Sequence, residues 1–148
     1  MERDKQYDIV VVSGGFDPVH KGHVRMFEAA KQLGYKVIAG ANSDAWLVRK
    51  KGKAFMNFAE RAEIIRAFRA VDEVLPFNDD DDTAINLLVR VQTMYPDCTI
   101  AFANGGDRVD GNTPEAGFSS AYKIDMLWNV GGGKIQSSSD LIKAAGTK

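Results

Sequence analysis

The feature that most constrains the fold is an apolar segment near the amino terminus, residues 7–12, which reads Tyr-Asp-Ile-Val-Val-Val. Its last four residues are all β-branched. Such a run is typical of a strand that is buried on both faces, as in the centre of a parallel sheet. Gly14 and Gly15 follow the run and allow the backbone to turn or to approach a ligand closely. The sequence therefore predicts a central parallel strand that ends in a glycine turn.

A helix and a second strand follow this turn. Apolar residues recur there at helical spacing, at Val24, Phe27, Ala30 and Leu33. Gly34 ends the helix and residues 36–41 form the next strand, which completes a βαβ unit. Further strands are predicted at residues 72–76, 99–103 and 124–130, and helices at residues 58–68, 85–94, after Pro114 and after Ser139. This alternation predicts an α/β fold with a doubly wound parallel sheet, in one domain that spans residues 1–148.

Charge and hydropathy exclude several classes of protein. The chain has 19 basic and 20 acidic residues and a net charge of −1, which argues against binding of polymeric nucleic acid. No segment reaches the roughly 20 apolar residues that span a bilayer, and the charged amino terminus is unlike a signal peptide. The single Cys98 is expected to be an ordinary buried thiol. We therefore expect a soluble cytoplasmic protein that does not bind membranes.

An acidic run, residues 79–82, precedes the predicted helix at residues 85–94. Four consecutive aspartates are usually a solvated loop, and acidic residues before a helix suit its positive dipole end. A metal site is the alternative interpretation.

The loop after the first strand carries the strongest chemical signal. His20 and His23 are three residues apart at the start of a helix, so both imidazoles can face one point, and Gly22 between them leaves room for a ligand. A helix start also offers unpaired N–H groups that bind phosphate. Two imidazoles can donate hydrogen bonds to phosphate oxygens and, when protonated, offset charge in a transition state. Zinc is the rival ligand, although these are the only histidines and no third ligand is evident.

This segment resembles the cytidylyltransferase-like family of nucleotidyltransferases, which carry a His-x-Gly-His motif. The matching residues are Gly14, Phe16, Asp17, His20, Gly22 and His23. The resemblance implies a Rossmann-like fold with five parallel strands in the order 3-2-1-4-5. It also implies transfer of CMP or AMP from a nucleoside triphosphate to a phosphorylated small molecule, such as a polyol or sugar phosphate, with release of pyrophosphate.

Further segments extend the resemblance over most of the chain. Asp44 follows the second strand, and a basic stretch, residues 49–53, is expected in the loop after it. The family places a phosphate-binding lysine near Lys53 and an arginine near Arg61. Later segments match at Gly105 and Asp107, beside the fourth strand, and at Ser137, Ser138 and Ser139, before the last helix. One departure is Gly15, where glycerol-phosphate members have serine or threonine. Another is Lys134, which stands near an arginine position of some members.

The resemblance assigns a role to each of these residues. Catalysis would involve His20, His23, Lys53 and Arg61. The nucleotide would be bound by Gly14, Gly15, Phe16, Asp17, Gly22, Gly105, Asp107, Ser137, Ser138 and Ser139. The phosphorylated acceptor would be bound by Asp44, Lys50, Lys51 and Lys134. We expect Mg²⁺ to be held through the nucleotide phosphates rather than by protein ligands, and the family resemblance implies a homodimer. The competing hypothesis is a nucleotide-binding module without catalysis.

Overall fold

The computed structural model of the chain describes residues 5–103 and 124–127. The helices and strands follow one another as β1 (Tyr7–Gly14), α1 (Lys21–Leu33), β2 (Gly34–Ala41), α2 (Asp44–Lys51), α3 (Phe58–Arg66), β3 (Glu73–Leu75), α4 (Ile85–Met94), β4 (Ile100–Ala103) and β5 (Asp125–Leu127). The strands form a single sheet in the order β3-β2-β1-β4-β5, and every neighbouring pair is parallel. The predicted α/β class and strand order are therefore confirmed.

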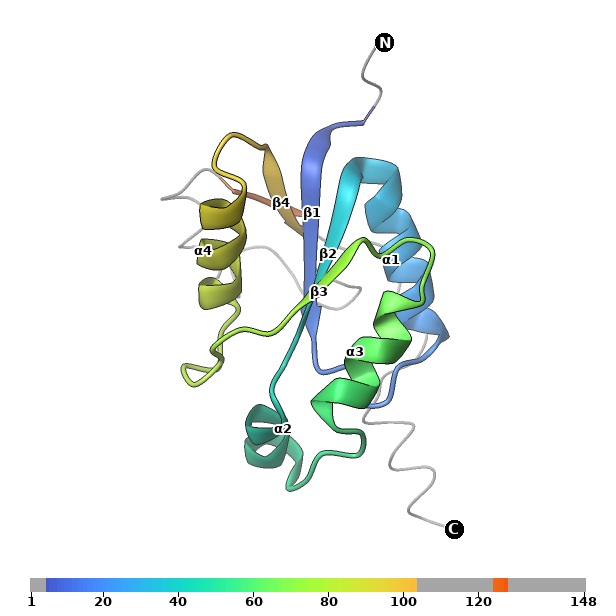
Figure 1. The fold of residues 1–148 in the computed structure, drawn as a ribbon, viewed down its shortest axis with the longest axis vertical. Coiled ribbons are helices and arrows are strands. Elements are labelled where there is room, and N and C mark those ends of the chain that lie inside the picture. Colours follow the sequence, from blue (N-terminus) through green and yellow to red (C-terminus); the bar gives the residue numbers. More distant parts are fainter. Residues whose placement is uncertain (1–4, 104–123, 128–148) are drawn as a thin grey trace.

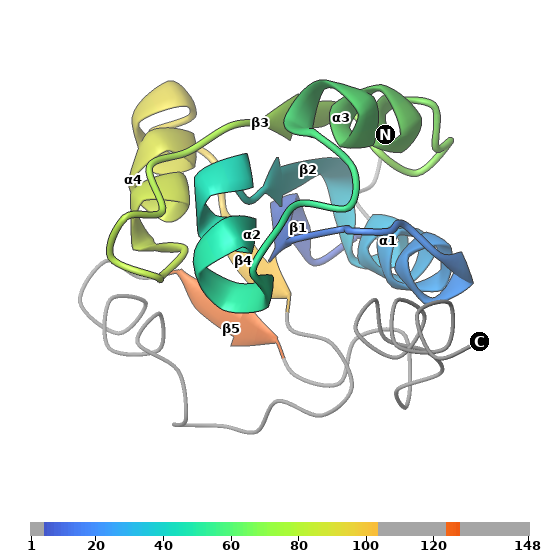
Figure 2. The same cartoon turned by 90° about the horizontal axis from the view of Figure 1, so that it is seen from below.

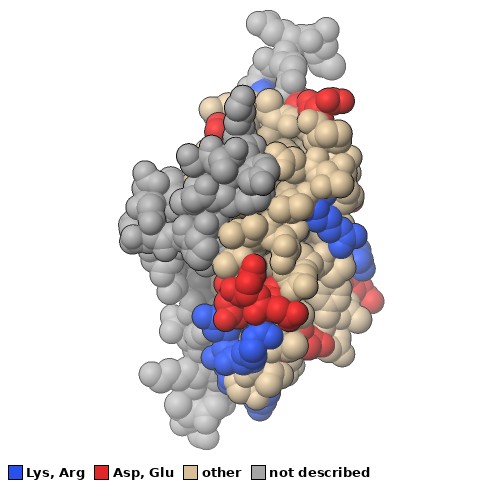
Figure 3. Space-filling view, turned by 90° about the vertical axis from the view of Figure 1, so that its left-hand side faces the viewer, with Lys and Arg blue, Asp and Glu red and all other residues tan. Residues whose placement is uncertain are grey.

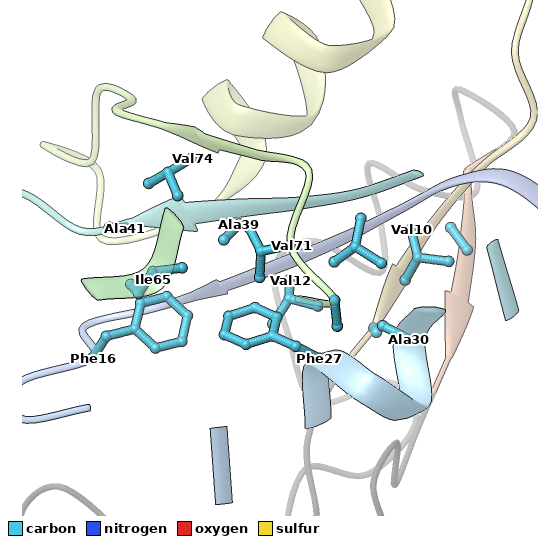
Figure 4. Packing of buried hydrophobic residues seen from close by; sticks show 14 of the residues in the cluster. Val10, Val12, Phe16, Phe27, Ala30, Ala39, Ala41, Ile65, Val71 and Val74 are labelled. Atoms are coloured by element: carbon cyan, nitrogen blue, oxygen red, sulfur yellow. The ribbon is translucent and has the colours of Figure 1, made fainter. Parts of the chain in front are cut away.

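The central strand β1 is buried on both faces because its side chains alternate between two apolar clusters. Val10 and Val12 lie in one cluster with Phe27 of α1 and Ile65 of α3 (Figure 4). The intervening residues of β1 lie in the second cluster, with the apolar side of α4. Figure 1 shows the corresponding layers, with α1 and α3 on one side of the sheet and α4 on the other. Gly40 of β2 permits this packing, since a Cβ there would collide with Leu87 of α4.

The helix α2 differs from the sequence-based expectation. Residues 49–51 were expected in a loop, but they form the last turn of this helix. The Oγ atom of Ser43 accepts a hydrogen bond from the backbone N–H of Trp46, at 3.0 Å, and so caps the start of the helix. Gly52 has a φ of 89° and ends it in the left-handed conformation that glycine tolerates. Both signals are in the sequence, but the short helix buries too few apolar residues to show a periodic pattern.

The helix α2 lies across the carboxyl ends of the strands rather than on a face of the sheet (Figures 1 and 2). This edge of an open parallel sheet is where ligands bind, at the point where the strand order reverses. In the strand order observed here, that point lies between β1 and β4.

Some expectations concern residues that the structure does not describe. These are the helices after Pro114 and Ser139 and the end of the fifth strand beyond residue 127. Within residues 5–103 and 124–127, no helix is long and apolar enough to cross a membrane.

Candidate functional site

The loop between β1 and α1 is built around the buried ring of Phe16. Phe16 is 2% exposed and has a φ of 52°, a conformation that costs a residue other than glycine about 1–2 kcal/mol. Packing holds the residue there. Its ring lies 5.5 Å from that of Phe27 in α1 and meets the His23 ring edge to face at 4.8 Å. The Phe16 ring therefore packs against the ring of His23, one of the two histidines.

The two histidines cap the helix α1 with their own ring nitrogens. Nδ1 of His20 accepts a hydrogen bond from the backbone N–H of Gly22, and Nδ1 of His23 accepts one from the backbone N–H of His20, both at 3.1 Å. The rings are stacked, with their centroids 3.9 Å apart. Because each Nδ1 is an acceptor, the ring proton of each neutral histidine is on Nε2. The pair therefore offers two N–H donors in a fixed orientation.

Both imidazoles are neutral at pH 7 in this structure. Burial lowers the pKa of His23 to about 3, and repulsion from the His20 ring, when that ring is protonated, and from the Lys51 ammonium adds to the effect. Burial also lowers the pKa of His20. Protonation of either Nδ1 would moreover break a capping bond. In the absence of a ligand, the two imidazoles thus offer neutral N–H donors rather than the positive charge that would offset charge in a transition state.

Asp17 also lies in this loop, and its carboxylate is bonded to backbone N–H groups. It is fully buried, and its carboxylate accepts hydrogen bonds from the backbone N–H groups of Phe55, at 2.7 Å, and Met56. Asp17 therefore connects the loop between β1 and α1, called the histidine loop below, to the segment between α2 and α3.

Arg61 of α3 is fully buried and bonded to protein acceptors on every side. Its Nε donates to the carbonyl oxygen of Met56, at 2.9 Å. Its Nη1 donates to the carbonyl oxygens of Gly15 and Asn42, at 2.8 and 2.7 Å. Its Nη2 bonds Oδ1 of Asp44, at 2.7 Å. Arg61 thus connects the three segments that carry Gly15, Asn42 and Met56. The sequence analysis assigned it to orienting the substrate and the triphosphate.

Within the basic stretch, residues 49–53, Lys51 is bonded to the histidine loop. Its Nζ donates to the carbonyl oxygen of Asp17, at 3.0 Å, and burial lowers its pKa while the nearby Asp17 carboxylate opposes the shift. The ammonium of Lys50 lies 5.7 Å from the centre of the Trp46 ring, and Lys53 is exposed beyond the end of the helix. The contact with the histidine loop is therefore made by Lys51, which was assigned to the acceptor from the sequence.

The loop after β3 contains a residue that the sequence analysis missed. Asp79 is 2% exposed, so the interpretation of residues 79–82 as a solvated loop is wrong for its first member. Its carboxylate accepts hydrogen bonds from Nδ2 of Asn42, at 3.1 Å, and from the backbone N–H and the hydroxyl of Ser43, both at 2.7 Å. These bonds lower its pKa even though burial acts in the opposite direction. Asp79 differs from the aspartates that follow it because hydrogen-bond donors at the end of β2, distant in sequence, contact its carboxylate.

Gly15 is closely approached by α2. A Cβ at this position would lie 3.1 Å from Cδ2 of Leu47, a tight contact, and 3.5 Å from Cζ3 of Trp46, an ordinary one. Nε1 of Trp46 is buried and has no hydrogen-bond partner among the described residues.

Several predicted site residues lie outside the described parts of the chain, namely Gly105, Asp107, Lys134, Ser137, Ser138 and Ser139. Within the residues that are described, no group of three or more histidine, cysteine, aspartate or glutamate side chains could hold a metal ion. What the structure brings together at the end of β1 is a pair of imidazole donors, the start of α1 and the cation Lys51. This combination suits an anion with several oxygens, such as a phosphate chain.

Comparisons with known proteins identify relatives of the chain. Residues 11–143 match the family model described as cytidylyltransferase-like. The chain is 34% identical over 136 residues to the bifunctional protein HldE of Coxiella burnetii (strain RSA 493 / Nine Mile phase I), a match that covers 82% of this chain and 28% of the relative. It is 36% identical over 135 residues to the bifunctional protein HldE of Campylobacter jejuni (strain RM1221), covering 85% and 28%. The chain thus spans less than a third of the length of these relatives.

Solved structures share the fold. A lipopolysaccharide core biosynthesis protein from Thermoplasma volcanium GSS1 is similar with a TM-score of 0.63 and 21% identity, over 83% of this chain and 96% of that one. A bifunctional NMN adenylyltransferase/ADP ribose pyrophosphatase from Francisella tularensis, in complex with AMP and a manganese ion, gives a TM-score of 0.65 with 18% identity, over 96% and 42%.

Proposed function

Because this chain belongs to the cytidylyltransferase-like family, we propose that it transfers CMP or AMP from a nucleoside triphosphate to a phosphorylated small molecule and releases pyrophosphate. The observation that carries the proposal is the pair of imidazoles at the end of β1, each with its Nε2–H free of the capping bonds that hold Nδ1. The pair lies where ligands of open α/β sheets bind.

The reaction needs no protein nucleophile. An oxygen of the acceptor phosphate, already largely ionised near neutral pH, attacks the α-phosphorus in line, and the bond from that phosphorus to the bridging oxygen of the pyrophosphate breaks. The protein contributes orientation and stabilisation of the charge that develops. In this scheme the Nε2–H groups of His20 and His23 bind phosphate oxygens. The anionic ligand also raises the pKa of both rings, so that partial protonation adds to the stabilisation.

The cations of α2 complete the phosphate site. We assign Lys51 to the triphosphate side, because its ammonium is bonded to the loop that carries the histidines. Lys50 and Lys53 are exposed and suit the acceptor phosphate, with Asp44 nearby for a hydroxyl group. Arg61 is a positioning residue in this scheme, since its four bonds hold the loops that carry Gly15, Asn42 and Met56 together.

In this proposal a divalent cation enters the site with the nucleotide. The imidazole donors of His20 and His23 and the ammonium of Lys51 would bind the phosphates of that complex. The Mg²⁺ ion would neutralise part of the phosphate charge.

The donor nucleotide is CTP or ATP in this proposal. Adenylyltransferases among the structural neighbours, one of them bound to AMP, support testing ATP beside CTP. The resemblance to sugar-phosphate and polyol-phosphate enzymes supports those acceptors. It also supports a homodimer and a cytoplasmic location, for which light scattering and cell fractionation are the direct measurements.

The test is a matrix of four nucleoside triphosphates against a panel of phosphorylated metabolites, read by pyrophosphate release. With the best pair, His20→Ala and His23→Ala should each lower kcat/KM by about 100-fold or more, the range for loss of a preorganised donor. Arg25→Ala, an exposed change on the same helix, is the control. Turnover of both histidine variants within a few-fold of the parent would contradict these roles. Nucleotide binding by calorimetry with no pyrophosphate release from any pair would favour a non-catalytic binding module.

A further inference from the structure

The helix α2 is attached to the rest of the molecule mainly by polar bonds. Leu47 is the single buried residue among its eight, whereas α3 and α4 each bury three. The helix also lies across the strand ends and not against a face of the sheet (Figure 2). Its apolar contacts come from Leu47 and the half-buried Trp46, so the bonds from neighbouring loops also help to fix its position.

The start of α2 is bonded to the carboxylate of Asp79. One oxygen accepts from the Ser43 hydroxyl, and the other accepts from the Ser43 backbone N–H and from Nδ2 of Asn42. Ser43 is the cap of the helix, so Asp79 holds the residue from which α2 begins. An ionised carboxylate with three donors forms bonds about twice as strong as neutral ones.

The end of α2 is bonded to the backbone carbonyl group of Asp79. Nη2 of Arg49, in the last turn, donates to the carbonyl oxygen of Asp79 at 2.8 Å and pairs with Oδ1 of Asp82 at 3.1 Å. On the face of the molecule drawn in Figure 3, an acidic and a basic cluster lie against each other. Residue 79 therefore contacts both ends of the helix.

The position of α2 matters because the helix ends in Lys51. The ammonium of Lys51 reaches the carbonyl oxygen of Asp17, in the loop that leads to His20. A rotation or shift of α2 would therefore move a cation of the site relative to the histidine pair. Asp79 is thus linked to the histidine loop through α2 and Lys51, and also through Asn42, whose carbonyl oxygen accepts from the same Arg61 nitrogen as that of Gly15.

We propose that Asp79 is a positioning residue of the transferase site, which clamps α2 at both ends so that Lys51 stands beside the histidine loop. This inference rests on the proposed function for its kinetic consequence but not for its structural one. Asp79 itself touches no substrate in this account.

The test compares Asp79→Asn with Asp80→Asn, which changes the charge equally at an exposed neighbour. The asparagine keeps the shape of the side chain but cannot accept all three bonds. We expect kcat/KM to fall about 10- to 100-fold in Asp79→Asn, mostly through a higher KM for the nucleotide, because a displaced Lys51 weakens phosphate binding in ground and transition states alike. Asp80→Asn should stay within twofold of the parent.

A second readout separates positioning from folding. The chain has two histidines, so the spectrum of ¹³C-labelled histidine contains two sets of ring signals. Asp79→Asn should shift the His23 signals while the protein remains folded, and Asp80→Asn should not. If Asp79→Asn does not fold, Arg49→Met provides the same test, since it removes the second attachment and leaves the Asp79 carboxylate bonded to Ser43.

The outcomes are distinguishable. A lower melting temperature in Asp79→Asn, with kcat/KM and the His23 signals unchanged from those of Asp80→Asn, would show a structural role only and overturn the inference. A parent protein without activity on any substrate pair would refute the proposed function alone, because the histidine signals still report whether Asp79 places Lys51.

Discussion

Replacing Arg61 by methionine tests whether this buried cation organises the site or binds a ligand. The side chain is fully buried and donates four hydrogen bonds, three of them to the carbonyl oxygens of Gly15, Asn42 and Met56. Methionine fills a similar volume but donates none. The three carbonyl oxygens then lose their partner, at about 1–3 kcal/mol each. Water can reach part of the vacated site, since the Asp44 side chain is 47% exposed.

We therefore expect Arg61→Met to lower the free energy of unfolding by about 3–5 kcal/mol, because three carbonyl oxygens lose their donor together and water compensates only in part. Urea titration followed by circular dichroism measures this quantity, provided that unfolding is two-state. Arg66→Met, an exposed arginine in the last turn of the same helix, is the matched control and should change stability by less than about 0.5 kcal/mol. A loss below about 1 kcal/mol in Arg61→Met would refute the argument, because it would mean that the carbonyl oxygens are not dependent on the guanidinium. If Arg61→Met kept full stability but lost affinity for the nucleotide, Arg61 would instead be a residue that binds the ligand.

Three further predictions follow from the described contacts. The pKa of His23 is about 3 in the folded chain and about 6.5 when unfolded, so the unfolded state binds the proton first as the pH falls. The stability contributed by neutral His23 is therefore full above pH 6.5 and is lost as the pH decreases toward 3. The urea midpoint of His23→Gln should fall less than that of the parent over this pH range. Phe16→Ala should lower the free energy of unfolding by about 3–5 kcal/mol in a thermal melt, because the buried ring supports both His23 and Phe27; an unchanged melting temperature would contradict this packing. Burial and the hydrogen bond to Asp125, at 2.7 Å, raise the pKa of Tyr7 to about 12, so absorbance titration of Tyr7→Phe should lose a phenol that ionises near pH 12 rather than near pH 10.

The fold was predictable where local and long-range signals coincide. The β-branched residues of β1 indicated a central parallel strand, and the spacing of Phe27 and Ala30 indicated the helix that covers it. The helix α2 was missed because its polar residues, Arg49 to Lys51, read as a basic loop and only Leu47 is buried. Capping residues at Ser43 and Gly52 marked its ends, but a short helix needs tertiary bonds that no periodicity shows.

The site was predictable in its residue types and less so in their roles. The spacing of His20 and His23 correctly indicated two rings at one helix start, since it follows from helix geometry. The burial of Arg61 and Asp79 could not be predicted, because each depends on acceptors or donors that the fold brings from several loops. A charged residue in a sequence is expected at the surface unless its partners are known.

The two imidazoles at the start of α1 have a further consequence, because one nitrogen of each ring caps the helix and the other takes no part in the capping bonds. In the proposed function, the tasks of beginning the helix and of binding the ligand are thus divided within each ring. An asparagine at position 23 could imitate the inner nitrogen and a glutamine the outer one. Exchanging the residue for each amide in turn would therefore dissect the two tasks, which an alanine removes together.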